Sequence, residues 1–253
     1  MDIRNQSLEA IILKARGYRE QDQLLTVVSV ENGPESVLAR GARKAESPLR
    51  SVCQPYSRAC LLLTPTKGGL RFLAEGSPRE SYILPESSLS AFAYAAYLAE
   101  LLLAAWPPQK PAPELYYLAQ AAFSLLKLDE DHARTARFFE LRLLASLGWL
   151  PPADALRSCS CCGQAPAGRR FRLSPQQGAL LCEACSQGDG APLISAGAAL
   201  SLHRLLTLPL PRIPAIRLRG AVADELEQAL EYYLRYHLEY AAKAKRLLAS
   251  LLA

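Results

Sequence analysis

The sequence LEAIILKARGYREQDQLLTVVSVENGPESVLA, residues 8–39, carries the clearest strand pattern in the chain. Its apolar runs are rich in Ile, Leu and Val, which favour strands, and Glu31-Asn32-Gly33-Pro34 is a strong turn signal between two of these runs. We expect strands at residues 8–15, 24–30, 36–39, 56–63 and 70–74. Five short strands predict a small closed barrel of the OB-fold type over residues 1–80. The polar, basic connection at 41–55 is expected to be a mobile loop at the barrel mouth.

After residue 85 the pattern changes from strands to helices. We expect helices at residues 88–105, 113–128, 131–148, 197–206 and 224–253. The first is apolar on nearly every side, which indicates a buried helix rather than a membrane span, because it contains Glu100 and ends at Pro107-Pro108. The last is one long helix with an apolar stripe, acidic residues near its start and basic residues near its end.

Two Cys-x-x-Cys pairs are the strongest chemical signal, and they consist of Cys159, Cys162, Cys182 and Cys185. Four thiolates at this spacing can close a tetrahedron around one structural Zn²⁺. Short apolar stretches between the pairs flank a turn, so residues 157–190 are predicted to form a zinc ribbon inserted between helices. A dithiol redox pair is the alternative reading, although such a motif needs only one pair. The other three cysteines, including Cys161, are expected to be free thiols in a reducing cytoplasm.

Basic residues occur in blocks, and the net charge of the chain is +5. Blocks of this kind suit a partner with a phosphate backbone, or they simply keep a surface soluble. The candidate contacts with such a backbone, which become DNA contacts under the family resemblance described below, are Lys14, Arg16, Arg19, Arg40, Arg43, Lys44 and Arg50. Tyr18 and Tyr56 are candidates for base stacking or for the core. Arg169, Arg170 and Arg172 give the ribbon a second possible contact.

Motifs for bond-breaking chemistry are missing from the sequence. It has no G-x-x-x-x-G-K-[ST] loop, no G-x-G-x-x-G after a strand, no H-E-x-x-H and no G-x-S-x-G. Its three histidines are far apart along the chain. We therefore expect a binding protein rather than an enzyme. The N-terminus shows no signal-peptide pattern, which favours the cytoplasm.

Taken in order, several segments resemble the RecO family of bacterial DNA repair and recombination mediators. They are residues 8–14, 18–22, 39–44, 54–56, 137–144 and 147–149, with the Cys-x-x-Cys-Gly and Gly178-Ala179-Leu180-Leu181-Cys182 segments. The turn at 31–36 departs from the basic turn typical of that family. The C-terminal helix lacks a clear family signature, so its role is inferred from its pattern alone.

The expected architecture is an α+β fold. An N-terminal five-stranded OB-fold barrel (1–80) is followed by an all-α helical domain in two parts (81–156 and 191–253) with an inserted zinc ribbon (157–190). The resemblance implies a protein that binds single- and double-stranded DNA and anneals complementary strands. It also implies partnership with RecR in loading RecA onto DNA coated by the single-strand-binding protein SSB.

Two arginines on an otherwise apolar helix, Arg137 and Arg142, are the candidate site for the acidic, hydrophobic tail of SSB. Two competing interpretations remain open. OB-folds and zinc ribbons serve RNA as readily as DNA, so an RNA-binding or transcription-associated protein is the alternative. A purely structural scaffold is the other.

Overall fold

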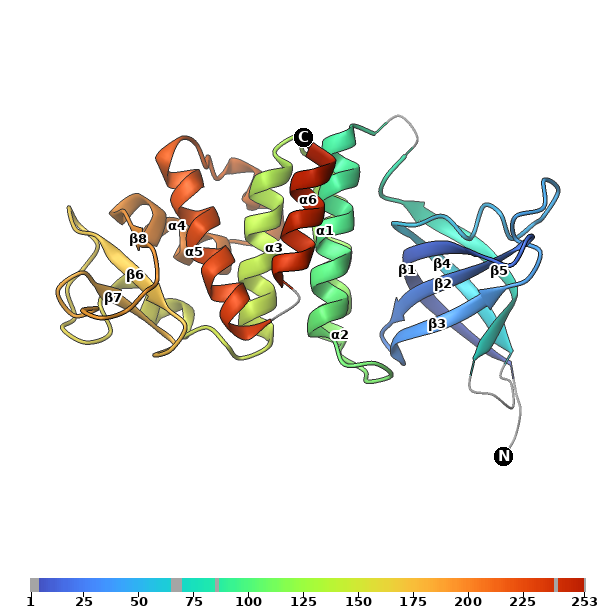
Figure 1. Ribbon diagram of the computed structural model, residues 1–253, viewed down its shortest axis with the longest axis horizontal. Helices are drawn as coiled ribbons and strands as arrows, with labels where there is room; N and C mark the ends of the chain where they lie inside the picture. The colour runs from blue at the N-terminus through green and yellow to red at the C-terminus, as the bar shows by residue number, and fades with distance from the viewer. Residues whose placement is uncertain (1–4, 65–69, 85–86, 239–240, 253) are drawn as a thin grey trace. The chain divides into compact units, whose positions relative to one another are not determined.

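The computed structural model describes residues 5–64, 70–84, 87–238 and 241–252 (Figure 1). The chain divides into two compact units, with the boundary between Leu128 and Asp129. The first unit contains the N-terminal strands and two helices. The second contains the cysteine pairs and the other helices.

The N-terminal strands form a closed barrel, drawn from blue to cyan in Figure 1. Its strands are β1 (Gln6–Tyr18), β2 (Asp22–Ser29), β3 (Gly33–Ala39), β4 (Ser57–Thr64) and β5 (Arg71–Ser81). Their order around the barrel is β1-β2-β3-β5-β4, and all neighbours are antiparallel except β3 and β5. That parallel seam consists of only two paired positions, Val37 with Arg71 and Leu38 with Phe72. The predicted five-stranded OB-fold barrel is confirmed.

The barrel core is built from side chains that alternate between the two faces of each strand. Along β4 every second residue is buried, and Leu61 and Leu63 are fully enclosed. The strand β5 runs to Ser81, well beyond the predicted end at residue 74. Gly76 lies within this extension, where a Cβ would sit 2.8 Å from Val52 Cγ1, so any larger residue would require the Val52 side chain or the backbone to shift.

The connection between β3 and β4 closes one end of the barrel. It is a succession of hydrogen-bonded turns, in which Lys44 donates to Gly41 O and Arg50 donates to Ser47 O, each at 3.1 Å. Its apolar side chains Ala42, Val52 and Cys53 belong to the barrel core. We expected a mobile loop at the mouth, whereas the structure shows an ordered segment with an apolar underside and a polar, basic outer surface.

Two helices complete the first unit, α1 (Leu89–Ala105) and α2 (Pro113–Leu128). Aromatic rings join them to the barrel: Tyr56 lies 5.6 Å from Phe92 and 5.9 Å from Phe123, measured between ring centroids. The ion pair between Lys14 of β1 and Glu100 of α1 adds a polar contact at 2.6 Å. No helix in the described part of the chain is long and apolar enough to cross a membrane.

The second unit combines a small sheet with helices. It contains α3 (His132–Ser146), the 3-10 turns η1 (Ala153–Arg157) and η2 (Leu210–Ala215), the strands β6 (Phe171–Ser174), β7 (Ala179–Cys182) and β8 (Leu193–Ile194), and the helices α4 (Ala196–Thr207), α5 (Ala221–His237) and α6 (Ala241–Leu252). The strand order is β7-β6-β8, and both pairings are antiparallel. The predicted ribbon, inserted between helices, is therefore present.

The prediction of a single helix over 224–253 is wrong. The helix α5 ends at the extended residue Leu238, and α6 begins at Ala241. Lys245 of α6 forms an ion pair with Glu227 of α5, 18 residues earlier. In a continuous helix these two positions would be about 27 Å apart. The break thus lets α6 return toward α5, and this tertiary contact is not visible in the helical periodicity.

Candidate metal centre and nucleic-acid interface

The four paired cysteines come together in the second unit. The sulfur atoms of Cys159, Cys162, Cys182 and Cys185 all lie within 4.8 Å of one another. Cys162 Sγ and Cys182 Sγ are 3.7 Å apart. A tetrahedral site with metal–sulfur bonds of 2.3 Å has edges of about 3.8 Å, so this spacing fits a four-thiolate metal site. The group can hold a metal ion.

Backbone hydrogen bonds shape both knuckles. In the first, Gly163 donates to Cys159 O at 2.8 Å and takes a positive φ of 72°, which glycine adopts without strain. In the second, Cys185 donates to Cys182 O at 3.0 Å. Ser160 donates to Leu180 O at 2.9 Å and so ties the first knuckle to β7. The turns and the hairpin together bring the two pairs to one point.

The thiols do not have equal acidity. Burial alone would raise the pKa of Cys159, but the backbone N–H groups of Cys182, Cys162 and Cys161 outweigh it and lower that pKa to about 6. Cys182 N lies 3.3 Å from Cys159 Sγ. Hydrogen bonds with the neighbouring thiols raise the pKa of Cys185. The lowered pKa of Cys159 favours its thiolate, the form that binds a metal, whereas Cys161 is exposed and lies outside the described four-sulfur group.

Four of the predicted DNA contacts lie on the segment that closes the barrel end. Arg43 and Arg50 line a hollow of about 370 Å³ with Gln23 and Gln54. Arg40 and Lys44 line a second hollow, of about 470 Å³, on the same segment. All four side chains are exposed. We call this set, Arg40, Arg43, Lys44 and Arg50, the barrel-loop cluster.

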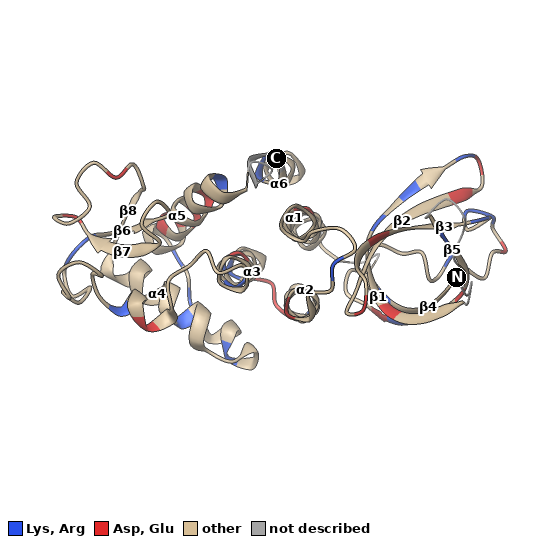
Figure 2. Ribbon diagram, turned by 90° about the horizontal axis from the view of Figure 1, so that it is seen from below, with Lys and Arg blue, Asp and Glu red and all other residues tan. Residues whose placement is uncertain are grey.

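The turn between β1 and β2 supports this cluster. Arg43 N donates to Gln21 O at 3.0 Å, and Gly41 N donates to Asp22 Oδ1 at 2.8 Å. Arg43 Nη1 lies 3.2 Å from the position that a Cβ at Gly17 would occupy, so the missing side chain makes room for the guanidinium. Figure 2 shows Lys and Arg on the strands and loops of the barrel.

The remaining predicted contacts are placed differently. Arg16 and Arg19 are exposed at the end of β1 and in the turn after it, beside the exposed ring of Tyr18. Lys14 is held by Glu100 and lies against α1. Tyr56 is a core residue, only 7% exposed, so its alternative role in base stacking has no surface to act from. Sequence reasoning also missed Phe72, whose ring lies 3.9 Å from the guanidinium carbon of Arg40.

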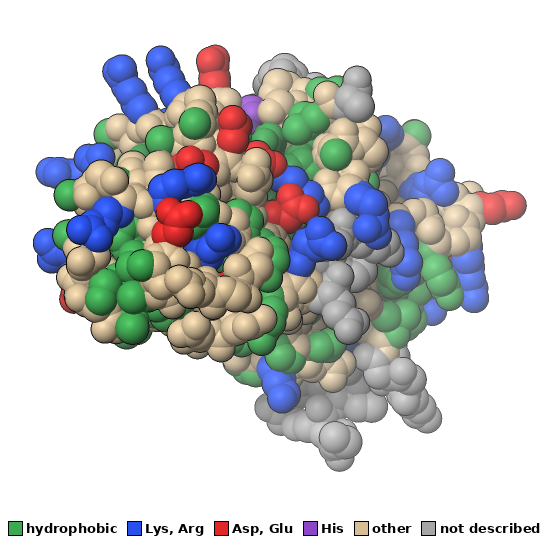
Figure 3. Space-filling model, turned by 60° about the vertical axis from the view of Figure 1, so that its left-hand side comes forward, with side chains coloured by type: hydrophobic (Ala, Val, Ile, Leu, Met, Phe, Trp, Pro, Cys, Tyr) green, Lys and Arg blue, Asp and Glu red, His purple; other side chains and the backbone are tan. Residues whose placement is uncertain are grey.

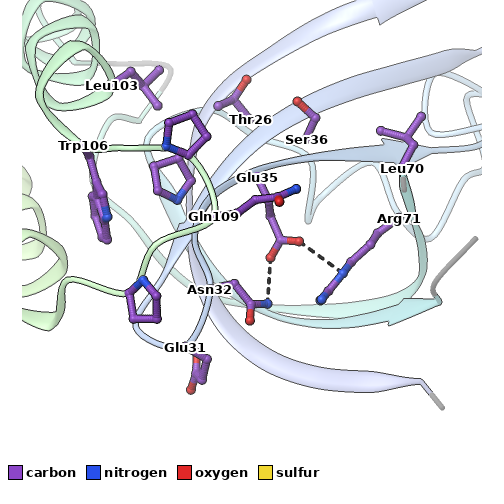
Figure 4. A pocket seen from close by; sticks show the side chains of 13 residues that line it. Thr26, Glu31, Asn32, Glu35, Ser36, Leu70, Arg71, Leu103, Trp106 and Gln109 are labelled. Atoms are coloured by element: carbon purple, nitrogen blue, oxygen red, sulfur yellow. Dashed lines mark hydrogen bonds and ion pairs between the residues drawn. The ribbon is translucent and has the colours of Figure 1, made fainter. Parts of the chain in front are cut away.

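Another hollow of the first unit, of about 830 Å³, lies between β3 and the connection from α1 to α2 (Figure 4). Its charged groups interact with one another: Glu35 lies 3.4 Å from Arg71 and accepts a hydrogen bond from Asn32 at 3.0 Å. Gln109 N donates to Pro34 O and joins the two walls. The side-chain contacts therefore join parts of the barrel to one another, and the Gln109–Pro34 hydrogen bond joins the barrel to the connection between α1 and α2.

Comparison with known proteins decides the family. The model of "Recombination protein O N terminal" matches residues 1–82, and that of "Recombination protein O C terminal" matches residues 86–246. This chain belongs to the RecO family. The resemblance found in the sequence motifs is confirmed, and the role of this family is DNA repair and recombination.

Relatives in the RecO family match the chain along most of its length. The chain is 34% identical to the DNA repair protein RecO of Pelotomaculum thermopropionicum over 232 residues, 91% of this chain and 88% of that protein. It is 30% identical to the DNA repair protein RecO of Symbiobacterium thermophilum, over 97% of each chain. With the DNA repair protein RecO of Desulfitobacterium hafniense (strain Y51), it shares 33% identity over 91% of this chain and 84% of that protein.

The two arginines proposed for the SSB tail have structural partners in this RecO-family chain. Arg137 is buried, lies 2.6 Å from Glu140, and approaches Glu227 at 3.6 Å. Arg142 donates to the carbonyl oxygens of Leu205 and Leu208 at the end of α4. An incoming carboxylate would have to compete with these partners, so the SSB site stays a prediction.

Proposed function

We propose that this RecO-family protein is a DNA repair and recombination mediator without bond-breaking activity. It binds single- and double-stranded DNA, anneals complementary strands and, with RecR, helps to load RecA onto SSB-coated DNA. The observation that carries the proposal is the barrel-loop cluster, four exposed basic side chains on one ordered segment of an OB-fold barrel. We also propose a cytoplasmic, nucleoid-associated location and domain boundaries after residues 80, 156 and 190.

The chemistry of annealing fits this surface. Strands must be held through their phosphates so that the base edges stay free to pair. Arginine and lysine supply that grip without reading sequence. Arg16 and Arg19 extend the basic surface along the β1–β2 turn, and Tyr18 is available for stacking on a base. Lys14 contributes only where DNA displaces Glu100.

The test is the salt dependence of binding to a labelled thymidine oligonucleotide. Replacing Arg43 and Arg50 together with Ala should lower the slope of log affinity against log salt by about 1.4, or about 0.7 per lost contact with a single strand. Arg79→Ala removes an exposed arginine from β5, outside the cluster, and is the matched control. An unchanged slope in the double variant would remove the cluster from the binding site.

Annealing assays distinguish the proposed role as a DNA recombination mediator from the alternative RNA-binding function. The wild-type protein should anneal complementary DNA strands coated with SSB, and the Arg43, Arg50 double variant should do so more slowly because its grip on phosphates is weaker. Annealing of RNA but not of DNA would favour the RNA-binding or transcription-associated function instead.

We propose Zn²⁺ as the metal of the four-cysteine site, in a structural role. A site closed by four protein ligands leaves no position for a substrate. Thiolates also suit iron, so metal analysis and absorption spectra of the purified protein are the test. One zinc per chain and thiols that react only after chelation are expected. An iron–thiolate spectrum, or a freely reacting Cys-x-x-Cys pair, would contradict it.

We keep the helix α3 as the proposed region for the SSB tail. Arg142 is the residue to change first, because Arg137 is buried with Glu140 and its loss would destabilise the fold. Arg142→Ala should weaken binding of an SSB-tail peptide, while Arg142→Lys keeps the charge and should retain part of it. Normal affinity in Arg142→Ala, at unchanged thermal stability, would move the site elsewhere.

A further inference from the structure

A second basic hollow lies on the ribbon, in the other compact unit from the barrel. It measures about 660 Å³, and three arginines line it: Arg169 and Arg170, which precede β6, and Arg172 within β6. Opposite them lies the turn of the second knuckle, residues 183–188. We call this site the ribbon hollow. Basic side chains also stand out over much of the face seen in Figure 3.

The positive charge of the ribbon hollow is not balanced by ion pairs. Arg170 donates to Leu193 O at 3.2 Å, Arg172 donates to Ala191 O, and Arg169 donates to the side-chain oxygen of Gln164. All three acceptors are neutral, and none of the ion pairs found between described residues includes these arginines. Glu183 is the single acidic residue among those that line the hollow. The three guanidinium groups and the one carboxylate give these lining side chains a net charge of +2, to which the charge of the neighbouring four-cysteine site adds its own contribution.

Two further features indicate that the hollow has space for a ligand near its backbone. Gly168 and Gly188 line it, and a Cβ at either position would meet no atom within 4 Å. The side chains of Arg169 and Arg170 are exposed. Guanidinium groups bind phosphate oxygens through pairs of parallel hydrogen bonds, so two accessible arginines suit such a ligand.

The residues that line the hollow favour one of two anionic partners, a phosphodiester backbone, over the other, an acidic peptide. An acidic peptide with a hydrophobic end needs an apolar subsite, and Ala184 is the one apolar side chain of the hollow outside the four-cysteine site. A phosphodiester backbone needs only charge and hydrogen-bond donors. We propose that the ribbon hollow binds the phosphates of a nucleic-acid strand, as a second contact in addition to the barrel-loop cluster. The inference rests on the proposed DNA-binding function and adds a site on the other unit.

The experiment measures binding of a labelled thymidine oligonucleotide to the full chain at several salt concentrations. The variant is Arg169→Ala with Arg170→Ala, because both side chains are exposed and make few contacts. The slope of log affinity against log salt should fall by about 1.4, for two lost contacts with a single strand. Glu183→Gln should strengthen binding at low salt, and the Arg-to-Lys double variant should keep most of the slope.

The matched control is Arg157→Ala, which removes an exposed arginine of η1 outside the hollow. Equal metal content and melting temperature show that the variants are folded. A wild-type slope in the Arg169, Arg170 double variant would overturn the proposal, as would an equal change in Arg157→Ala. Loss of binding to an acidic, hydrophobic-ended peptide with an unchanged DNA slope would overturn it in favour of a peptide site.

The Arg43, Arg50 variant of the barrel is measured in parallel. If it lowers the slope and the ribbon variant does not, the second contact is wrong while the proposed function stands. If the wild-type chain does not bind the oligonucleotide at low salt, the proposed function itself fails.

Discussion

The barrel and the ribbon are both built from antiparallel hairpins, but different forces hold them together. The barrel closes five strands around a shared core of Leu, Ile, Val and Ala side chains. The ribbon has three strands of four, four and two residues. So small a sheet buries too little apolar surface to be stable alone, and four convergent thiols lie where a metal can cross-link it. The hydrophobic effect stabilises one β region, and metal coordination is expected to stabilise the other.

The largest expected effect is removal of the metal. Structural zinc contributes on the order of 10–16 kcal/mol to the folding of zinc-finger peptides, so chelation should unfold the ribbon and leave the barrel folded. Hydrogen exchange is the measurement: amides of β6 and β7 should lose protection, while those of β1 and β4 keep it.

Simultaneous loss of protection in both regions would contradict this distinction between barrel and ribbon, because it would mean that the barrel also depends on the metal. Retained protection in the ribbon would show that its apolar contacts are sufficient. Adding back Zn²⁺ is the control, since protection should return.

A pair of matched core substitutions gives the next largest effect. Leu61 in the barrel and Leu180 in the ribbon are both fully buried, and replacing either with Ala should cost about 2–5 kcal/mol. Only Leu180→Ala should also weaken metal binding, because the free energy of metal binding includes the free energy of folding the ribbon. Denaturant unfolding and competition with a chelator measure the two quantities. Equal metal affinities in both variants would contradict the view that only the folding of the ribbon is coupled to metal binding.

The smallest effect distinguishes two neighbouring thiols. Cys161→Ser changes an exposed side chain outside the four-sulfur group, so metal content should stay the same and stability should move by at most about 0.5 kcal/mol. Cys162→Ser removes a member of the group and should abolish tight binding. Metal analysis of both variants is the check, and loss of the metal from Cys161→Ser would redefine the ligand set.

Local patterns in the sequence predicted much of this molecule. The runs of Ile, Leu and Val fixed the strands of the barrel, and the spacing of Cys159, Cys162, Cys182 and Cys185 predicted a group that the structure brings together. Both signals depend on neighbours along the chain: strand residues alternate between faces, and a two-residue spacing makes a knuckle.

Long-range contacts were the part that could not be predicted. Val52 and Cys53 lie in a polar, basic segment, and only the closed barrel beneath them gives these side chains a place in the core. The break at Leu238 has no proline or glycine to announce it and is tied to the pairing of Lys245 with Glu227. Arg137 was a candidate for binding an acidic tail, and the sequence did not show that Glu227, 90 residues away along the chain, approaches it in addition to the nearby Glu140.

The order of strands around the barrel has a consequence for its synthesis. The first strand, β1, pairs with β4, and β3 is joined to β5 only by the two positions of the parallel seam. While the chain emerges from the ribosome, β1 and β3 therefore keep open edges until residues 57–81 have followed them. Open edges invite pairing with other chains. In the ribbon, one edge of β6 stays open only until the two-residue strand β8 follows at Leu193–Ile194, so the barrel leaves longer edges open in the nascent chain.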